Sequence, residues 1–305
     1  MKILIAGSHG MIGSAAAQYL EDRGHPIVRL VRHAPGSGEV WWDPDAGQID
    51  AACLEGFDAV VHLATMPWPL RWTAKAKQKM RANRLTTNRL LAESLAAVIN
   101  RPRVLICASG MGYYPSSGDI VLTEDRPAGT SFLAMLQRDG EAATAAATAA
   151  GIRTVHLRIP PVIGGTALQR IGFQAGSGQQ WTSWVGRDEL ASIVGFAVAA
   201  NDLSGGVNAV SPNPMRNADF AAVSTRALGQ KPGCIIPDFL MHLIFGEMGD
   251  ELLMASRRIQ PAKLLSAGYQ FRFADLEQCL QHEIECLHST PAAPLRPSGS
   301  RSKAV

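Results

Sequence analysis

The chain has 305 residues, of which 47% are hydrophobic and 18% charged, with a formal net charge of +3. This composition is typical of a globular protein with one large domain and a smaller appendage, or with two domains. The charge is too small and scattered to favour nucleic-acid binding, and the longest apolar segment, residues 190–200, is too short to span a bilayer.

The first predicted strand, residues 2–6, runs into a glycine-rich loop with the spacing G-x-x-G-x-x-G. In this pattern Gly7 makes a tight turn, Gly10 lets the backbone approach a pyrophosphate, and Gly13 lets helix and strand pack closely. Apolar residues at helical spacing follow over residues 11–23 and predict a helix there. The N-terminus of such a helix offers free N–H groups to phosphates. We therefore predict a dinucleotide site. The loop residues expected to line it are Gly7, Gly10, Met11, Ile12 and Gly13.

The second predicted strand, residues 26–31, indicates which dinucleotide binds. NAD sites usually carry Asp or Glu about 20 residues after the glycines, where it accepts hydrogen bonds from the ribose 2′-OH. This chain has Arg32 there, and a guanidinium suits a 2′-phosphate through its charge and fork geometry. We therefore expect NADP(H) in preference to NAD(H). The alternative is that Arg32 is an ordinary solvated charge at the end of the strand.

Strand-like and helix-like segments alternate along the rest of the chain. Further strands are expected at residues 39–42, 58–64, 103–108, 153–158 and 206–210, and helices at 73–99, 132–150, 188–200 and 217–228. This alternation predicts an α/β fold with a doubly wound, parallel Rossmann-type sheet. Ligands of such sheets lie outside the carboxyl ends of the strands. Asn217 is expected to cap its helix, and Gly229 to stop it.

From about residue 231 the pattern changes. Pro237 opens a helical stretch, Asp275 caps a last helix, and a tail rich in Pro, Ser and Arg follows. The predicted division is a Rossmann-type domain at 1–230 with cleft-forming insertions at about 160–187, a small, mainly helical C-terminal domain on the substrate side at 231–287, and a disordered tail at 288–305.

The five cysteines are far apart and form no C-x-x-C pair. This is typical of reduced thiols in a cytoplasmic protein rather than of disulfides or zinc. No signal peptide is expected, because the first apolar run is a strand of the fold. We therefore expect a cytoplasmic protein with a small-molecule substrate, no metal site, and no membrane or nucleic-acid partner; a homodimer is compatible with these observations.

Several motifs in order resemble those of the extended short-chain dehydrogenase/reductases: GSHGMIG, DAVVHLAT, Arg84-Leu85-Thr86, ASGMGYY and LRIPPVIG. Later segments look like the epimerase-family branch with a small helical C-terminal domain, namely GSGQQWTSWVGRDEL, NAVSPNPMRNADFA and LLSAGYQFRFADLEQCL. The resemblance covers residues 1–286. It implies a Rossmann-type fold, bound NADP(H) and a substrate cleft between two domains. It also places Val31, Arg32, Leu63, Ala64, Arg84 and Val162 at the cofactor.

The chain departs from the resemblance in its chemistry. The superfamily uses a Tyr-x-x-x-Lys pair on one helix face, where the ammonium lowers the pKa of the tyrosine so that it can move a proton. A Ser or Thr from the fifth strand completes that set. Here Leu136 stands at the tyrosine position, Gly140 at the lysine position and Gly110 at the hydroxyl position, although Ser109 is one residue away.

Other polar residues near the strand ends are candidates for the chemistry. Ser109 could donate a hydrogen bond to substrate or nicotinamide, or bond locally to the backbone. Tyr113 and Tyr114 follow the same strand and could reach the cleft or pack. Ser109 and Tyr113 are the candidate catalytic residues, and Arg71 could meet a cofactor phosphate.

Four further residues are interpreted from their positions. His62 lies within a strand and is expected in the core. Arg158 could contact an anion or form an ion pair with a carboxylate. Asp188 and Glu189 open a helix and are expected to cap it.

Two functions fit these observations. The first is an NADP-dependent oxidoreductase or epimerase that acts on a small hydroxyl or carbonyl compound, with hydride transfer supplied by the cofactor. The second is a catalytically silent NADP(H)-binding sensor or scaffold. The missing Tyr-Lys pair favours the second, whereas the retained cleft loops favour the first. Fold alone does not decide between them.

Overall fold

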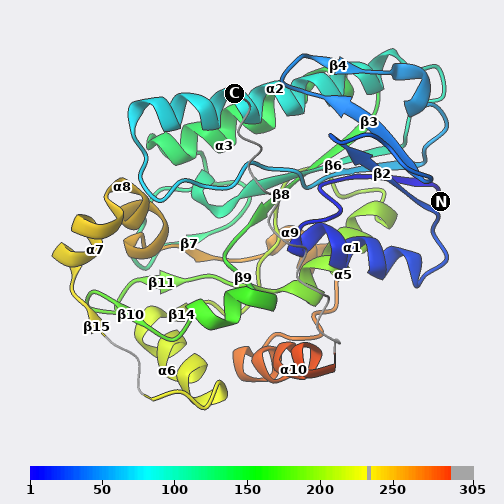
Figure 1. Cartoon of the computed structure of the whole chain (residues 1–305). Coiled ribbons are helices and arrows are strands. Elements are labelled where there is room, and N and C mark those ends of the chain that lie inside the picture. Colours follow the sequence, from blue (N-terminus) through cyan, green and yellow to red (C-terminus); the bar gives the residue numbers. More distant parts are fainter. Residues whose placement is uncertain (232–234, 290–305) are drawn as a thin grey trace, which may run out of the picture.

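The structure, a computed structural model, describes residues 1–231 and 235–289. Its centre is an eight-stranded sheet with the order β13-β8-β6-β5-β1-β2-β3-β4 (Figure 1). The strands are β1 (Ile3–Ala6), β2 (Ile27–Val31), β3 (Glu39–Asp43), β4 (Gln48–Ile49), β5 (Ala59–His62), β6 (Val104–Gly110), β8 (Arg153–Ile159) and β13 (Gly205–Asn208). All neighbours pair in parallel except β3 and β4. The predicted doubly wound α/β sheet is confirmed.

Helices cover both faces of this sheet because successive strand residues point to opposite sides. The helices that cover it are α1 (Met11–Glu21), α2 (Ala74–Ala97), α3 (Phe132–Ala142), the five-residue α4 (Ala145–Ala149) and α5 (Arg187–Ala199). On one face, Ile3 and Ile5 pack with residues of α1 and α5. On the other, Leu4 and Ala6 pack with α2 and α4. The two faces therefore carry separate hydrophobic clusters, one on either side of β1.

Two local predictions need correction. The helix expected at 132–150 is two helices, because the chain turns at Thr144, whose hydroxyl bonds to the Glu141 carbonyl at 2.9 Å and to Nε2 of His156 at 2.8 Å. Asn217 does not cap its helix; it is the first residue of α6 (Asn217–Ala227), and its Oδ1 accepts a hydrogen bond from the Ala175 amide. Gly229 does end this helix region, with a φ of +61°.

Short strand pairs and further helices complete the fold, and most of them lie beyond the carboxyl ends of the sheet (Figure 1). The pairs are β7 (Val121–Leu122) with β16 (Arg258–Ile259), β9 (Val162–Ile163) with β12 (Val185–Gly186), β10 (Gln174–Ala175) with β15 (Ile235–Ile236), and β11 (Trp181–Thr182) with β14 (Met215–Arg216). The helices are α7 (Asp238–Phe245), α8 (Glu247–Gly249), α9 (Ala262–Ser266) and α10 (Leu276–Ser289).

The expected division at residue 231 does not coincide with a break in packing. Leu276 and Leu280 of α10 share one hydrophobic cluster with Trp184 and Phe220 from before that point. The segment after 231 therefore completes a core that begins much earlier. Of the predicted disordered tail, residues 288–289 belong to α10, and 290–305 lie outside the described residues.

The carboxylates in the first turn of α5 do not cap it, which corrects the expectation for Asp188 and Glu189: the N-cap is Gly186, and among the described residues no side chain caps the helix. Glu189 is 1% exposed and accepts hydrogen bonds from the amides of Arg272 and Phe273, at 2.9 and 2.7 Å, and from the Tyr269 hydroxyl. It thereby fixes the irregular segment that precedes α10. Asp188 instead bonds to Arg187 and His282.

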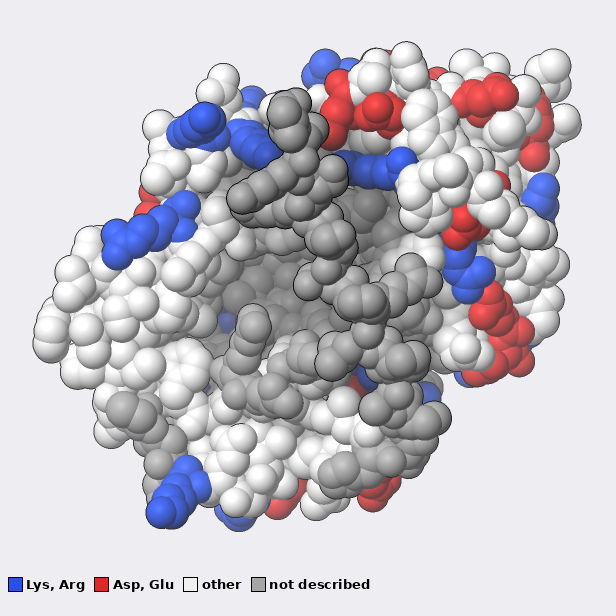
Figure 2. Space-filling view, in the orientation of Figure 1, with Lys and Arg blue, Asp and Glu red and all other residues white. Residues whose placement is uncertain are grey.

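The described surface shows mixed charge. On the face drawn in Figure 2, Lys and Arg side chains of the described residues are interspersed with Asp and Glu rather than collected in one patch. Within residues 1–231 and 235–289, none of the helices has both the length and the apolar character needed to cross a bilayer.

Candidate functional site

The glycine-rich loop joins β1 to α1, and two of its glycines are required by close packing. Gly7 has a φ of +84°, and a Cβ there would lie 2.6 Å from the Ala64 nitrogen. A Cβ at Gly13 would lie 2.1 Å from the Gly7 oxygen. Gly10 differs, because the nearest atom to its Cβ position is the Gly7 oxygen at 3.4 Å. The protein itself leaves room at Gly10, as expected where a pyrophosphate approaches the backbone.

A first cavity of about 440 Å³ lies over this loop. Its lining brings together most of the predicted cofactor residues. They are Gly7, Gly10, Met11, Ile12, Gly13, Arg32, Leu63 and Ala64, joined by Thr65, Met66 and Pro67. The N-terminus of α1 begins at Met11 in the same lining. The cavity thus combines a backbone that can be approached closely with the positive end of a helix dipole.

The other residues predicted to contact the cofactor are not in the lining of the first cavity. Val31 is buried under the first cavity, and Val162 packs against the core from β9. Arg84 lines a second cavity. The structure does not bring Arg71 to either cavity; its Nη2 donates a hydrogen bond to the Leu243 carbonyl at 3.0 Å.

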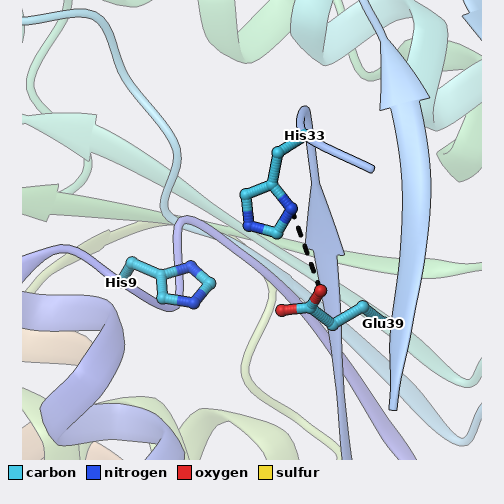
Figure 3. A group of neighbouring side chains, drawn as sticks. All are labelled: His9, His33 and Glu39. Atoms are coloured by element: carbon cyan, nitrogen blue, oxygen red, sulfur yellow. Dashed lines mark ion pairs between the residues drawn. The ribbon is translucent and has the colours of Figure 1, made fainter. Parts of the chain in front are cut away.

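Basic and imidazole groups gather at the Arg32 end of the first cavity. The Arg32 side chain is 47% exposed, and its Nη1 lies 3.7 Å from Oδ2 of Asp45. Close by, His9 of the glycine loop and His33 lie with their ring centroids 6.0 Å apart, and Glu39 lies 3.9 Å from His33 Nδ1 (Figure 3). Arg32 is therefore accessible to an anionic group that enters from solvent.

The second cavity, of about 380 Å³, adjoins the first because both are lined by Ile12, Leu63 and Thr65. Its wall is mostly apolar. The apolar residues include Trp68, Met111, Leu133, Ile159, Pro160, Pro161, Leu252 and Leu253. The polar side chains in its lining are Thr65, Arg84, Ser109 and Gln137. An apolar cavity with a few convergent polar groups is the usual form of a small-molecule site.

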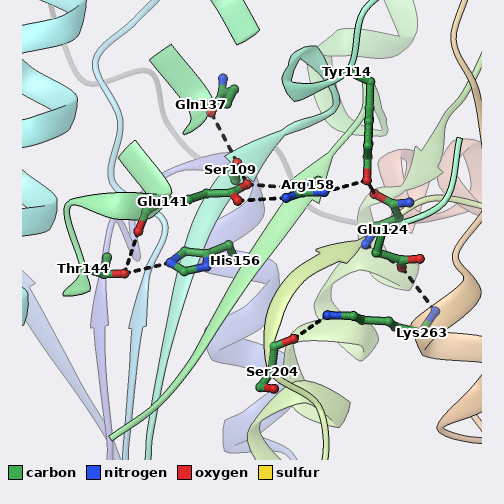
Figure 4. Close-up of polar contacts among 11 residues, drawn as sticks. Ser109, Tyr114, Glu124, Gln137, Glu141, Thr144, His156, Arg158, Ser204 and Lys263 are labelled. Atoms are coloured by element: carbon green, nitrogen blue, oxygen red, sulfur yellow. Dashed lines mark hydrogen bonds and ion pairs between the residues drawn. The ribbon is translucent and has the colours of Figure 1, made fainter. Parts of the chain in front are cut away.

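A buried polar network lies directly behind this cavity (Figure 4). The Ser109 hydroxyl donates to Oε1 of Glu141 at 2.7 Å and lies 3.5 Å from Oε1 of Gln137. Nε and Nη2 of Arg158 each donate to one Glu141 oxygen at 3.0 Å. Arg158 also donates to the Tyr114 hydroxyl at 2.7 Å. Of the two roles considered for Arg158, the structure shows the ion pair.

The two tyrosines near this network differ from the catalytic tyrosine of the superfamily in their surroundings. Burial raises the pKa of Tyr114 to about 12, so that hydroxyl stays protonated at neutral pH. Burial alone would lower the pKa of Arg158, but its hydrogen bonds and ion pair with Glu141 raise it above the ordinary value. The ring of Tyr113 lies 3.4 Å from the Arg158 guanidinium and is not in the lining of the second cavity, in contrast to the position expected for a catalytic group.

His62 lies in the core, as expected from its strand. It is 2% exposed, and its ring meets that of Trp42 edge-on at 5.7 Å. Burial lowers the pKa of His62 to about 3, so the imidazole is neutral at physiological pH.

Comparison with known proteins identifies the family. The model of the NAD dependent epimerase/dehydratase family matches residues 3–175. The chain belongs to this family. A domain family of unknown function matches residues 236–283. Epimerase family protein Mb2239 of Mycobacterium bovis is 36% identical over 91% of this chain and 96% of its own length. Epimerase family protein SDR39U1 of Homo sapiens is 32% identical over 93% of this chain and 100% of its own length.

Solved structures of similar proteins share the fold. The human epimerase family protein SDR39U1, solved with NADPH, is similar with a TM-score of 0.83 and 29% identity, over 93% of this chain and 99% of that one. A nucleoside-diphosphate sugar epimerase from Corynebacterium glutamicum is similar with a TM-score of 0.77 and 32% identity, over 93% of this chain and 58% of that one.

This epimerase-family chain fills the positions of the Tyr-Lys pair with packing residues. Leu136 is buried, and Gly140 makes room for Arg84, whose Cγ would lie 2.8 Å from a Cβ there. Gly110 likewise makes room for Gln137, whose Nε2 would lie 3.0 Å from a Cβ. The two glycines at positions where the superfamily has larger side chains therefore each admit a polar side chain close to the second cavity.

Sequence reasoning missed Gln137 and Glu141, the two α3 residues that face Ser109. They stand four residues apart and hence on one helix face, one position after the expected Tyr and Lys positions. Both are polar residues on a helix whose other inward positions are apolar, and that contrast is the signal that could have found them.

Proposed function

We propose that this protein binds NADP(H) along the first cavity, with the nicotinamide end directed to the second. Three features support this placement. Gly10 leaves space beside the N-terminus of α1 for a pyrophosphate, Arg32 offers an accessible guanidinium for a 2′-phosphate, and the two cavities adjoin at Ile12 and Leu63. The NADPH in the human SDR39U1 structure supports the same choice of cofactor.

We further propose an NADP(H)-dependent oxidoreductase that acts on a small, largely apolar carbonyl or hydroxyl compound. The observation that carries this proposal is the pair Ser109 and Gln137 in a mostly apolar cavity that adjoins the glycine loop. A nucleotide sugar fits less well, since Arg84 is the one charged side chain in this lining, and its Nη1 is bonded to the Ala108 carbonyl at 2.8 Å.

The residues of the second cavity bind and orient more than they transfer protons. When bound, NADP(H) supplies or accepts the hydride. The Gln137 amide can donate a hydrogen bond to a substrate oxygen. The Ser109 hydroxyl donates its proton to Glu141, so its oxygen remains an acceptor towards the cavity. No described residue in this lining is a tyrosine, lysine, histidine or carboxylic acid, so the substrate proton is exchanged with water.

A second candidate function, an NADP(H)-binding sensor without turnover, is favoured by the same network. Glu141 is bonded to both Ser109 and Arg158, and Tyr113 is stacked on Arg158. Glu141, Arg158 and Tyr113 therefore stabilise the fold through their contacts with one another, which leaves them poorly placed to exchange protons with a substrate. Measured turnover with firm NADPH binding separates the two functions.

Arg32→Ala is expected to remove the preference for NADPH over NADH. A charge-assisted contact between guanidinium and phosphate contributes roughly 1.5–3 kcal/mol, or about tenfold or more in affinity. Titration of protein fluorescence with each cofactor measures the effect. Arg71→Ala is the matched control, because the Arg71 guanidinium bonds to the Leu243 carbonyl outside both cavities. Equal affinities in the unaltered protein would refute the 2′-phosphate assignment.

Reduction of small ketones, aldehydes and quinones with NADPH is expected to be slow, because a missing general acid costs about 10²–10⁴-fold in rate. Gln137→Ala and Ser109→Ala should each lower the residual rate, measured as NADPH oxidation. Arg138→Ala, on the outer face of the same helix, should not. Rapid turnover that survives both cavity variants would mean that the chemistry uses other residues.

A further inference from the structure

A histidine, a cysteine and an aspartate meet between α5 and α10, away from both cavities. His282 Nε2 lies 2.9 Å from Asp188 Oδ2, and Cys286 Sγ lies 3.6 Å from the same nitrogen and 3.8 Å from the same oxygen. The three side chains are partly exposed. His282 and Cys286 are one helical turn apart on α10, so both point to the same side of that helix.

The spacing of these three atoms matches the coordination sphere of a small metal ion. A triangle with sides of 2.9, 3.6 and 3.8 Å has a circumscribed radius of about 2.0 Å. Zinc binds nitrogen and oxygen at about 2.0–2.2 Å and sulfur at about 2.3 Å. An ion slightly above the plane of the three atoms would therefore reach each at a normal bond length, without movement of either helix.

Neighbouring groups hold two of the ligands in place. Arg187 Nε donates to Oδ1 of Asp188 at 2.9 Å, which leaves Oδ2 turned towards His282. The ring of Phe273 stacks on His282 with 4.4 Å between centroids. Contacts of this kind, made to the ligands themselves, commonly orient metal sites.

The local charge also suits a divalent cation. Asp188 and a Cys286 thiolate carry one negative charge each, and Glu283, whose Oε1 accepts from the Asp188 amide at 3.2 Å, adds a third. Arg187, 3.4 Å from Oε2 of Glu283, offsets one of them. The remaining two negative charges would balance a doubly charged ion.

We propose that Asp188, His282 and Cys286 bind one zinc ion, with a water in the fourth position. Thiolate sulfur, imidazole nitrogen and carboxylate oxygen are the three ligand types that zinc takes from proteins, and three protein ligands with one water is a known zinc arrangement. The ion would join α10 to α5, which packs directly on the helix that follows the glycine loop. The site reverses the expectation from sequence that the chain has no metal site, and it does not depend on the proposed NADP(H) function.

Cobalt titration of the full chain, after removal of metal with a chelator, tests the site. Co²⁺ is expected to bind once per chain, with tetrahedral d–d bands and a charge-transfer band from the thiolate, and Zn²⁺ should displace it. Cys286→Ser should abolish the charge-transfer band, and His282→Ala should weaken binding at least about tenfold. Zinc should raise the thermal unfolding temperature of the unaltered chain but not of Cys286→Ser.

Two variants serve as matched controls. Cys53→Ser removes an exposed thiol that bonds to Asp50 and is not part of the proposed site. His9→Ala alters a second cluster of potential metal ligands, which His9 forms with His33 and Glu39. Both should keep the cobalt spectrum. A spectrum retained by Cys286→Ser, lost in either control, or absent from the unaltered chain would overturn the proposal. If Cys286→Ser fails to fold, Asp188→Asn replaces it, because asparagine has nearly the same size and shape as aspartate. This variant should bind cobalt more weakly than the unaltered chain.

Discussion

Gly10→Val is expected to abolish NADP(H) binding and leave the protein folded. The backbone at Gly10 is extended, with φ of −78° and ψ of 165°, which valine readily adopts. The nearest atom to the new Cβ is 3.4 Å away, so the branched side chain would project into the space of the first cavity. Loss of two charge-assisted hydrogen bonds to the pyrophosphate costs about 3 kcal/mol or more, or a factor of at least about 100 in affinity.

Gly13→Val provides the contrast for this experiment. A Cβ at Gly13 would lie 2.1 Å from the Gly7 oxygen, so this variant should disturb the contact of α1 with β1 and lower stability. Fluorescence titration with NADPH measures binding, and thermal unfolding measures stability. A Gly10→Val protein that binds NADPH normally, or that does not fold, would show that the loop does not meet the pyrophosphate as proposed.

Glu141→Ala is expected to destabilise the protein by about 3–5 kcal/mol, because it leaves a buried charge without its partner. The Arg158 side chain is 5% exposed, and Glu141 is the carboxylate that accepts two of its hydrogen bonds. The same substitution removes the acceptor of the Ser109 hydroxyl. Urea unfolding of the variant and the unaltered chain measures the difference in free energy.

Two controls separate this charge effect from simple truncation. The double variant Glu141→Leu with Arg158→Met removes both charges and should recover much of the lost stability. Glu277→Ala removes the partner of Arg226 in an ion pair whose side chains are 66% and 42% exposed, and it should cost at most about 1 kcal/mol. A Glu141→Ala loss as small as that of Glu277→Ala would mean that water solvates Arg158 in the folded protein.

The nucleotide half of the site could be predicted from sequence because its signals are local. Gly7 and Gly10 lie between β1 and α1, Gly13 lies in the first turn of α1, and Arg32 follows β2 directly. The spacing of residues within one short segment is enough to predict their relative positions, because contacts with distant parts of the chain are not needed. Arg71 lies outside both cavities and bonds to the Leu243 carbonyl, 172 residues away, a contact that no local pattern indicates.

The substrate half depends on contacts that no local pattern contains. Glu141 faces Ser109 because the helix face that carries Gln137 and Glu141 packs against the end of β6, and this contact joins residues 32 positions apart in the sequence. The proposed zinc ligands show the same limit, because Asp188 and His282 are 94 residues apart.

The walls of the two cavities come from very different stretches of the chain. Every residue that lines the first cavity lies between Gly7 and Pro67, whereas Leu252 and Leu253 close the second. Arg257, which is buried and donates to the Tyr114 carbonyl at 2.8 Å, holds that late segment in place. During synthesis on the ribosome, all residues that line the first cavity therefore emerge before Leu252 and Leu253, and the second cavity cannot close until those two leucines have been made.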